Sequence, residues 1–505
     1  MPEERIAIID LGSNTARLVV FAYEAKKHYQ LVDELREVVR LSEGMGEGKI
    51  IRADAYERAL QTLVSFKTYC DAAGIAKIRA TATSAVREAQ NGESFLRSAR
   101  ERAGLELELL PGDAEARMGT LAVANSLPYP DAIIFDIGGG SLEVSLMQGR
   151  KFVKAASWPL GAVTATEQFL QHDPVKKKEV KALLKETRSQ AEGFFADLPK
   201  ELPVIGIGGT IRNLADVQKK RENYVLDILH DYVLKKSDLA EIVEDLVEKT
   251  VVEKRDISGL NSDRADIITA GGIVVLEALE FSGAAEMIIS GMGLREGLFF
   301  TELMPDEPHL LDDVRGFSIA NLAQRYYDRP AHNEHVKVLS LKLFDELCSL
   351  HQYGDWEREL LGHAALIHDI GMAVNYYDHH KHGLFLVMSA ALPGFSHREQ
   401  ALIGLLCRYH RKGSPSSQGY DALLQEDDMA RLGKLAALLR LAEYLERSKS
   451  QRIKDLRCHI GEGFVQIEAL AQGDAYIELR EANDRKDLFA EAYGVKVEVI
   501  LGHLA

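Results

Sequence analysis

Two carboxylates flank a run of glycines in "DIGGGSLEV", which spans Asp136 to Val144. Consecutive glycines at the end of an apolar strand cost backbone entropy, so they indicate that something approaches the main chain closely. Exposed amides in such a turn bind anions, and phosphate is the natural ligand. Asp136 and Glu143 are positioned to hold a divalent ion against phosphate oxygens, and magnesium suits such hard ligands.

The same pattern occurs earlier in the chain. An apolar run from Ile6 to Asp10 ends in "DLGSN", and a second extended segment follows from Thr15 to Tyr23. Each copy therefore predicts two strands joined by a tight glycine turn, with Asp10 and Asp136 in equivalent places. The repeat predicts two related domains that face each other. A turn-capping role for Asp10 stays open as the alternative.

The surrounding elements alternate between helix and strand. Apolar spacing predicts helices over 54–73 and 113–124, strands over 77–82 and 152–158, and a strand that ends at the glycine loop 206–210. Further glycine-rich strand ends are expected in 268–279 and 289–299. Any one such loop could serve only a hairpin or bulge, but together they favour a phosphate ligand.

Five ordered motifs carry a family resemblance. "DLGSNTARLVV", "DIGGGSLEVSL", "TATSAVREAQN", "GDAEARMG" and "GIGGTIRNLA" resemble the exopolyphosphatase and guanosine pentaphosphate phosphohydrolase family. That family belongs to the actin-like ATPase superfamily. The resemblance covers roughly the first 300 residues. It implies an α/β fold with two ribonuclease H-like domains around a cleft.

The resemblance also implies roles for individual residues. Glu115, in "GDAEARMG", matches the glutamate that activates the attacking water, although a glutamate favoured by the helix dipole is the alternative. Asp136 and Glu143 complete the expected catalytic set and are the expected Mg²⁺ ligands. The expected substrate- and phosphate-binding residues are Asp10, Gly12, Asn14, Arg17, Arg87, Gly138, Gly139, Gly140, Ser141, Gly208, Gly209 and Thr210.

The chain changes character after about residue 310. Helical spacing continues to about residue 450, and histidines become frequent in an order that resembles an HD-type phosphohydrolase domain. One interpretation is a second divalent-metal site with its own phosphohydrolase activity. The favoured interpretation is a degenerate relative that docks the substrate or mediates dimerisation, because a glutamate stands where HD enzymes usually have an aspartate. The candidate ligands are His335, His368, Asp369, His382, His410 and Glu443.

Alternating patterns return after Ser450. "FVQIEAL", "AYIELRE" and "VKVEVIL" predict three strands around a helix at 485–493. The expected domains are 1–127 and 128–305, both ribonuclease H-like, an all-α HD-like domain over 306–452, and a small α+β module over 453–505.

Composition and charge indicate which partners and which cellular compartment to expect. The chain has 505 residues, 46% of them apolar, and a net charge of −16, which argues against non-specific nucleic-acid binding. Its acidic N-terminus is unlike a signal peptide, and no apolar run approaches the ~20 residues of a membrane span. The four cysteines are far apart and form no CxxC pair. A soluble, cytoplasmic protein without nucleic-acid or membrane partners is expected.

These observations predict an exopolyphosphatase. It would remove the terminal phosphate from linear polyphosphate, with guanosine pentaphosphate as a related substrate. An actin-like small-molecule kinase and a non-catalytic polyphosphate or alarmone sensor are the alternatives. A homodimer is compatible with the extra helical domain.

Overall fold

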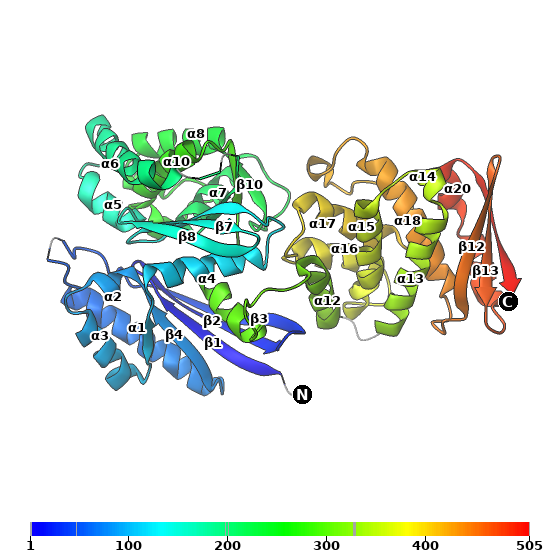
Figure 1. Cartoon of the computed structure of the whole chain (residues 1–505), viewed down its shortest axis with the longest axis horizontal. Coiled ribbons are helices and arrows are strands. Elements are labelled where there is room, and N and C mark those ends of the chain that lie inside the picture. The colour runs from blue at the N-terminus through cyan, green and yellow to red at the C-terminus, as the bar shows by residue number, and fades with distance from the viewer. Residues whose placement is uncertain (1–2, 47, 197, 200, 327–329, 504–505) are drawn as a thin grey trace. The chain divides into compact units, whose positions relative to one another are not determined.

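The structure is a computed structural model that describes residues 3–46, 48–196, 198–199, 201–326 and 330–503. Contacts divide the chain into two compact units (Figure 1). The first consists of Met1–Tyr224 and Leu229–Val314, and the second of Val225–Ile228 and Arg315–Ala505. The four expected domains are a finer division than this and stay a prediction.

Five strands of the first unit form a sheet with the order β3-β2-β1-β4-β5. β1 and β2 form the expected antiparallel hairpin, in which Asp10 pairs with Arg17. β4 is parallel to β1, and α1 contributes Leu60 and Leu63 to the core beneath the sheet. The elements are β1 (Glu4–Leu11), β2 (Thr15–Glu24), β3 (His28–Val38), α1 (Ala53–Ala72), β4 (Lys77–Ala82), α2 (Ser84–Glu88), α3 (Gly92–Ser98), β5 (Leu107–Leu109) and α4 (Gly112–Ala124).

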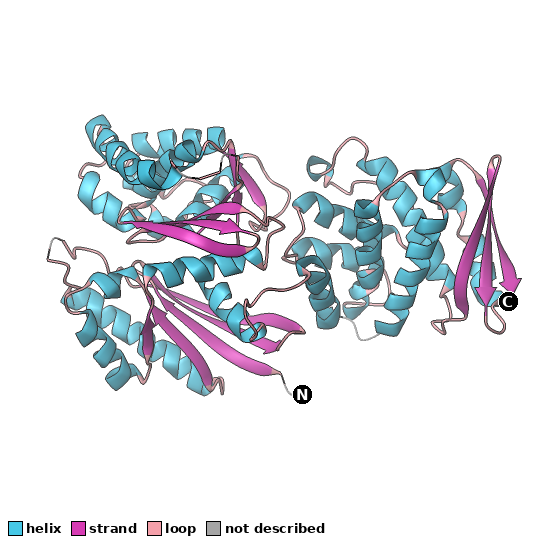
Figure 2. Ribbon diagram, viewed as in Figure 1, coloured by secondary structure: helices cyan, strands magenta, loops and turns pink. Residues whose placement is uncertain are grey.

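Six further strands form a second sheet, with the order β10-β11-β9-β6-β7-β8. β6 and β7 form the second hairpin, in which Asp136 pairs with Glu143. Helices α5, α6, α8 and α10 lie together on one side of this sheet (Figures 1 and 2). The elements are β6 (Ala132–Ile137), β7 (Leu142–Gln148), β8 (Lys151–Trp158), α5 (Ala162–Phe169), α6 (Lys177–Phe195), β9 (Val204–Ile207), α7 (Gly209–Arg221), β10 (Tyr232–Lys235), α8 (Lys236–Glu248), α9 (Val251–Lys254), α10 (Ile268–Ser282), β11 (Glu286–Ile289) and α11 (Leu294–Leu303).

The two sheets are copies of one topology. The order β3-β2-β1-β4-β5 in the first corresponds to β8-β7-β6-β9-β11 in the second, and β10 is an additional antiparallel edge strand. Asp10 and Asp136 occupy the same place, the penultimate residue of the first strand of each hairpin. The internal repeat expected from the sequence is therefore present in the fold.

One of the expected glycine-rich strand ends is wrong. Residues 268–279 lie in helix α10, which is buried in the core of the second sheet. A Cβ on Gly271 would lie 2.6 Å from the Thr210 side chain and 3.2 Å from that of Ala162. Gly271 thus serves close packing of the helix against its neighbours rather than a turn.

The second unit is helical and ends in a three-stranded sheet with the order β12-β13-β14. Segment 475–481, expected to be a strand, is instead helical from residue 476 onward. The buried positions Ala475, Glu478 and Ala482 follow helical spacing, whereas the apolar alternation that suggested a strand includes the exposed Ile477. The elements are α12 (Val314–Tyr326), α13 (Pro330–Glu346), α14 (Cys348–His351), α15 (Asp355–Ile367), α16 (His379–Ser389), α17 (His397–Tyr409), α18 (Asp428–Leu445), β12 (Ile453–Gly461), β13 (Phe464–Ala471), α19 (Tyr476–Asp484), α20 (Asp487–Tyr493) and β14 (Lys496–His503).

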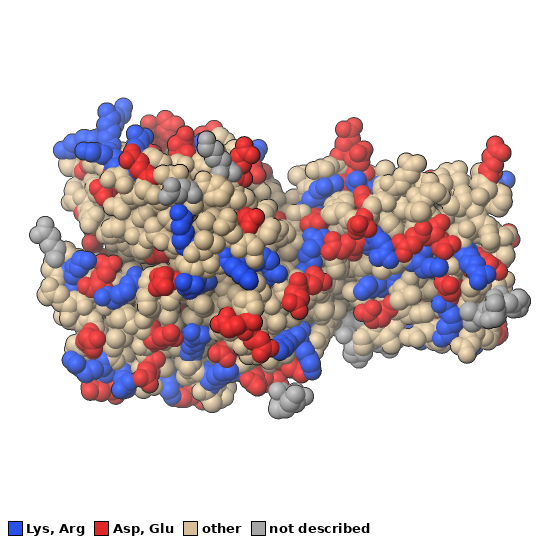
Figure 3. Space-filling model, in the orientation of Figure 1, with Lys and Arg blue, Asp and Glu red and all other residues tan. Residues whose placement is uncertain are grey.

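Charged side chains of both signs are interspersed over the face drawn in Figure 3, with a small group of basic ones over α6. The start of this helix carries the exposed Lys176, Lys177 and Lys178. Among the described residues, no helix combines the length and the apolar character that crossing a membrane requires.

Candidate functional site

A cavity in the first unit lies where the two hairpin turns meet. The turns after β1 and β6, the loop before α7 and the start of α4 all contribute to its wall. Parts of both sheets are therefore brought together around one space. The expected site residues that line it are Asp10, Gly12, Asn14, Arg17, Glu115, Asp136, Gly138, Gly139, Ser141, Gly208 and Gly209.

Four other expected residues lie next to this cavity rather than in its wall. Gly140 lines a neighbouring cavity, and Thr210 is buried in the first turn of α7. Glu143 is buried and accepts hydrogen bonds from the hydroxyls of Ser141 and Ser157. The guanidinium of Arg87 donates to the Leu110 carbonyl at 2.6 Å and lies 3.4 Å from the Glu115 carboxylate.

The glycine triplet allows the two turns to touch. A Cβ on Gly139 would lie 3.0 Å from the Ser13 side chain and 3.2 Å from the Asn14 amide nitrogen. A Cβ on Gly140 would lie 2.6 Å from the Ser84 hydroxyl. The absence of side chains in this turn therefore lets the other hairpin approach the main chain, in addition to any ligand.

The first turn of α5 holds the glycine turn in place. The amides of Ala162 and Val163 donate to the carbonyls of Gly138 and Gly139, and the Gly161 amide donates to the Gly140 carbonyl. The carbonyl oxygens of the turn are thereby satisfied by protein. The turn is thus a rigid part of the cavity wall.

Gly208 has both a backbone conformation and close neighbours that disfavour any side chain. Its φ is +91°, and an added Cβ would lie 2.8 Å from both the Asp136 carboxylate and the Ile137 carbonyl. Gly208→Ala is expected to lower the free energy of unfolding by about 1–3 kcal/mol, because it combines a strained φ with a steric clash. It should also displace Asp136 and reduce turnover.

Gly149→Ala is the matched control for Gly208→Ala. Gly149 also has a positive φ, +54°, but nothing lies within 4 Å of its added Cβ. Chemical denaturation and turnover of both variants would separate backbone strain from the clash. Equal behaviour of the two variants would contradict a role for the close packing of Gly208 against Asp136.

Four carboxylates share the cavity region: Asp10, Glu115, Asp136 and Glu143. Burial raises the pKa of Glu115 well above its usual value, and the carboxylates of Glu143 and Asp136 raise it further. Burial and the Glu143 carboxylate together raise the pKa of Asp136 to about 7. Burial also raises the pKa of Asp10 and of Glu143. Such a cluster favours a bound cation, because a cation offsets the repulsion among the carboxylates.

The donor set fits a hard divalent ion. Asp10 Oδ1 is buried and has no hydrogen-bond partner, although it belongs to a residue that lines the cavity. A buried, unpaired carboxylate oxygen is costly unless a ligand or ion satisfies it. Oxygen-only ligands suit Mg²⁺.

Arginines supply positive charge around the carboxylates. Arg17 was expected here, but Arg212, Arg264 and Arg295 also line the cavity and were not singled out from the sequence. Arg17 and Arg295 both bind the Glu34 carboxylate, at 2.8 and 3.0 Å. Glu34 thus fixes two guanidinium groups whose donors are suited to phosphate oxygens.

A sequence signal existed for two of these arginines. Arg212 and Arg295 each lie in the first turn of a helix that follows a glycine loop, α7 and α11. Arg264 follows no glycine loop, yet a Cβ on Gly209 would lie 2.1 Å from its guanidinium. Only the folded chain brings Arg264 against the loop before α7.

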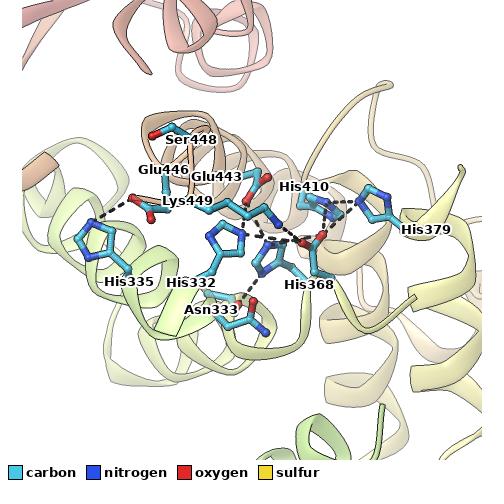
Figure 4. A network of polar contacts seen from close by, with 12 residues as sticks. His332, Asn333, His335, His368, His379, His410, Glu443, Glu446, Ser448 and Lys449 are labelled. Atoms are coloured by element: carbon cyan, nitrogen blue, oxygen red, sulfur yellow. Dashed lines mark hydrogen bonds and ion pairs between the residues drawn. The ribbon is translucent and has the colours of Figure 1, made fainter. Parts of the chain in front are cut away.

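The second unit contains a separate histidine cluster (Figure 4). Four of the expected ligands meet in it, namely His368, Asp369, His410 and Glu443. His332 and His379 join them and were not expected.

The expected ligands His335 and His382 are not part of this cluster. His335 Nε2 instead lies 2.9 Å from the Ile453 carbonyl and 3.4 Å from Glu446. His382 follows His379 by three residues on α16, as His335 follows His332 on α13. Residues three apart on a helix differ in direction by about 60° around its axis, and only the first residue of each pair is part of the cluster.

Comparisons with known proteins cover almost the whole chain. A family model described as the Ppx/GppA phosphatase family matches residues 19–305. A second model, described as Ppx/GppA phosphatase, domain III, matches residues 314–480.

Two curated relatives from strains of Aliivibrio fischeri carry the name guanosine-5'-triphosphate,3'-diphosphate pyrophosphatase. They are 27% and 26% identical to this chain over 444 residues, which is 86% of this chain and 86% of each relative.

Solved structures match the first part of the chain. An Aquifex aeolicus member of the Ppx/GppA family is 29% identical, with a TM-score of 0.52 over 61% of this chain and 99% of its own. An exopolyphosphatase from Cytophaga hutchinsonii is 24% identical, with a TM-score of 0.55 over 59% and 98%. The likeness to the Cytophaga hutchinsonii structure supports the fold of this part of the chain.

Proposed function

This chain belongs to the Ppx/GppA phosphatase family, and from that premise we propose that it is an exopolyphosphatase. It is a hydrolase of phosphoanhydrides that removes the terminal phosphate of linear polyphosphate. The reaction takes place in the cavity where the two hairpin turns meet.

One observation carries the proposal. A single cavity is lined by Glu115, by both glycine turns and by four arginines. A polyanionic chain end needs donors on several sides, and phosphoryl transfer depends mainly on positioning and on stabilising the developing charge. The main-chain amides of the turns and the guanidinium groups of Arg17, Arg212, Arg264 and Arg295 meet this need, although the chain as a whole is acidic.

Glu115 is the proposed general base. It orients a water molecule toward the terminal phosphorus and accepts its proton as the new P–O bond forms. Its pKa is raised by burial and by Glu143 and Asp136, which gives its carboxylate a strong affinity for that proton. Arg87, 3.4 Å from the carboxylate, holds Glu115 in position.

Asp10, Asp136 and Glu143 are the proposed Mg²⁺ ligands. A bound Mg²⁺ would neutralise charge on the phosphate oxygens near the leaving group. Asp136 and Glu143 are paired directly across the β6–β7 hairpin, and Asp10 approaches from the equivalent hairpin. Asp10 and Asp136 thus line the cavity from the two sheets, and Glu143 lies buried beside the cavity, paired with Asp136 across the hairpin.

Guanosine pentaphosphate is a second proposed substrate. Two of the curated relatives, each matching over 86% of this chain, carry the name guanosine-5'-triphosphate,3'-diphosphate pyrophosphatase. Polyphosphate and guanosine pentaphosphate both end in a phosphoanhydride, so the same base and donors would act on either.

Phosphate release from long-chain polyphosphate and from guanosine pentaphosphate should be measured side by side, with magnesium. Release from polyphosphate is expected, together with release from guanosine pentaphosphate if the second proposal holds. Release from neither, with phosphate transfer from ATP to an added acceptor, would instead support an actin-like kinase. Binding of both without turnover would support a sensor, and either result overturns the proposal.

A further inference from the structure

A further cavity lies in the second unit, between the ends of several helices. Its volume is about 530 Å³, and small-molecule sites typically enclose about 300–1,000 Å³. The loop before α16, the loop after α17, the last turn of α18 and the loop between α19 and α20 form its wall. Three tyrosines, Tyr376, Tyr377 and Tyr444, lie in the wall of this tyrosine cavity. Of the described residues that line it, none belongs to the histidine cluster, so the cavity is a separate feature of the unit.

Three cationic side chains line the tyrosine cavity. The guanidinium carbon of Arg411 lies 5.6 Å from the ring centre of Tyr376. That of Arg485 lies 5.5 Å from the ring centre of Tyr444. Within the described part of the chain, neither arginine forms an ion pair with a carboxylate. Lys412 is the third cation, and its side chain is 64% exposed. Planar guanidinium groups bind phosphate oxygens in a bidentate manner, so this wall suits a phosphate group.

Two of the tyrosines are exposed at the cavity. Tyr376 is 50% exposed and Tyr377 is 79% exposed. Their ring centres are 5.6 Å apart and the ring planes meet at 81°, so the two rings form a corner. Exposed aromatic rings beside arginines bind the flat bases of nucleic acids by stacking. The corner therefore suits a planar, aromatic group.

A carboxylate in the wall distinguishes between phosphate ligands. Asp378 lines the cavity, and its oxygen atoms lie 3.0 Å from the Lys381 ammonium and 3.7 Å from that of Lys412. A carboxylate repels a bare phosphate chain, but it readily accepts hydrogen bonds from the hydroxyls of a ribose. The wall thus suits a ligand that carries a sugar as well as phosphate.

His380 contributes a buried polar group to the same wall. Its side chain is only 1% exposed, and neither ring nitrogen has a hydrogen-bond partner among the described residues. Nε2 is 3.9 Å from Asp378 Oδ1, which is beyond hydrogen-bonding distance. A buried imidazole without partners is costly unless a ligand supplies them. His380 is therefore an independent indication that a polar ligand binds here.

We propose that the tyrosine cavity binds a nucleotide, at a site separate from the cavity in which hydrolysis takes place. Arg411, Lys412 and Arg485 hold its phosphate groups. Its base stacks in the corner formed by the exposed rings of Tyr376 and Tyr377. This inference is independent of the reaction proposed for the first unit.

Photochemical labelling of the full-length protein tests the proposal. A photoreactive ATP, with an azide on its base, is added in the presence of chelator, so that magnesium-dependent turnover does not consume it. After irradiation, mass spectrometry of the peptides locates the label. Saturable labelling within segment 376–380 is expected. Any label in the first unit is measured on other peptides, so this result does not depend on the reaction proposed there.

Competition shows which parts of the ligand are recognised. ATP and GTP should each prevent labelling of segment 376–380 at concentrations at least about tenfold lower than inorganic triphosphate, which has the phosphates without a base. Arg485→Gln should raise the concentration of photoreactive ATP needed for half-maximal labelling about tenfold, because a phosphate partner is lost.

Matched controls lie outside the cavity. Arg480→Gln makes the same chemical change on α19, at a side chain that is 58% exposed, and should leave the labelling unchanged. Asp136→Asn should also leave it unchanged, which separates this site from the cavity of the first unit. Circular dichroism identifies variants that fail to fold. If Arg485→Gln is among them, Lys412→Gln takes its place.

Three results would overturn the nucleotide site. The first is the absence of saturable label in segment 376–380 of the unmodified protein. The second is competition by inorganic triphosphate as strong as that by ATP, which would assign the cavity to a phosphate chain. The third is equal loss of labelling in the Arg485 and Arg480 variants.

Discussion

Glu115→Gln is expected to lower kcat for polyphosphate hydrolysis about 10²–10⁴-fold while leaving substrate affinity nearly unchanged. Glutamine keeps the shape of the side chain but cannot accept the proton of the attacking water, and general-base catalysis contributes on this scale. Affinity should persist because the cavity's amides and arginines remain in place. Steady-state release of phosphate gives kcat, and polyphosphate binding to the variant gives the affinity.

Asp113→Asn is the matched control for Glu115→Gln. Asp113 lies in the same first turn of α4 and is also acidic, but its side chain is 66% exposed, against 13% for Glu115. Its amide variant should retain normal turnover. A Glu115→Gln enzyme with normal kcat would remove this residue from the mechanism, and equal losses in both variants would indicate disturbance of the helix instead.

Asp136→Asn is expected to lower turnover about 10²-fold or more and to raise the magnesium concentration needed for half-maximal activity. Metal ions contribute several kcal/mol to charge stabilisation in such reactions, and this change removes a proposed ligand. Activity measured against magnesium concentration tests both effects. A normal magnesium requirement would contradict the role of Asp136 as a ligand.

Thermal stability gives Asp136→Asn a second signature. Burial and the Glu143 carboxylate raise the pKa of Asp136 to about 7, so the folded protein resists its ionisation. Removing the charge should therefore leave the Tm of the variant in chelator equal to or higher than that of the unmodified protein in chelator. Magnesium should raise the Tm of the variant less than it raises that of the unmodified protein. A large loss of Tm in chelator would instead indicate that the variant is misfolded. Asp113→Asn again serves as the control, since it makes the same chemical change at an exposed position.

The hairpins around Asp10 and Asp136 were predictable because they depend on neighbours in the chain. An apolar run, an aspartate, a glycine turn and a second run form a local pattern, and both copies fold as antiparallel pairs. The repeat then predicted two related sheets. The roles of the residues at their turns stay predictions until turnover is measured.

Local patterns misled where packing decided the outcome. Gly271 looked like part of a strand end, but it allows α10 to pack against Thr210 and Ala162. Segment 475–481 alternates like a strand, yet the buried positions 475, 478 and 482 follow helical spacing. Tertiary contacts overrode the local signal in both cases.

The sequence by itself determined the two hairpins, their glycine turns and the carboxylates beside them, because each arises within about ten consecutive residues. The tertiary structure alone decided that Arg264 lies against Gly209, and that His332 and His379 rather than His335 and His382 face Asp369. Those choices depend on how segments far apart in the chain pack and on the rotation of each helix about its axis. Neither the packing of distant segments nor the rotation of a helix about its axis is encoded in the spacing of nearby residues.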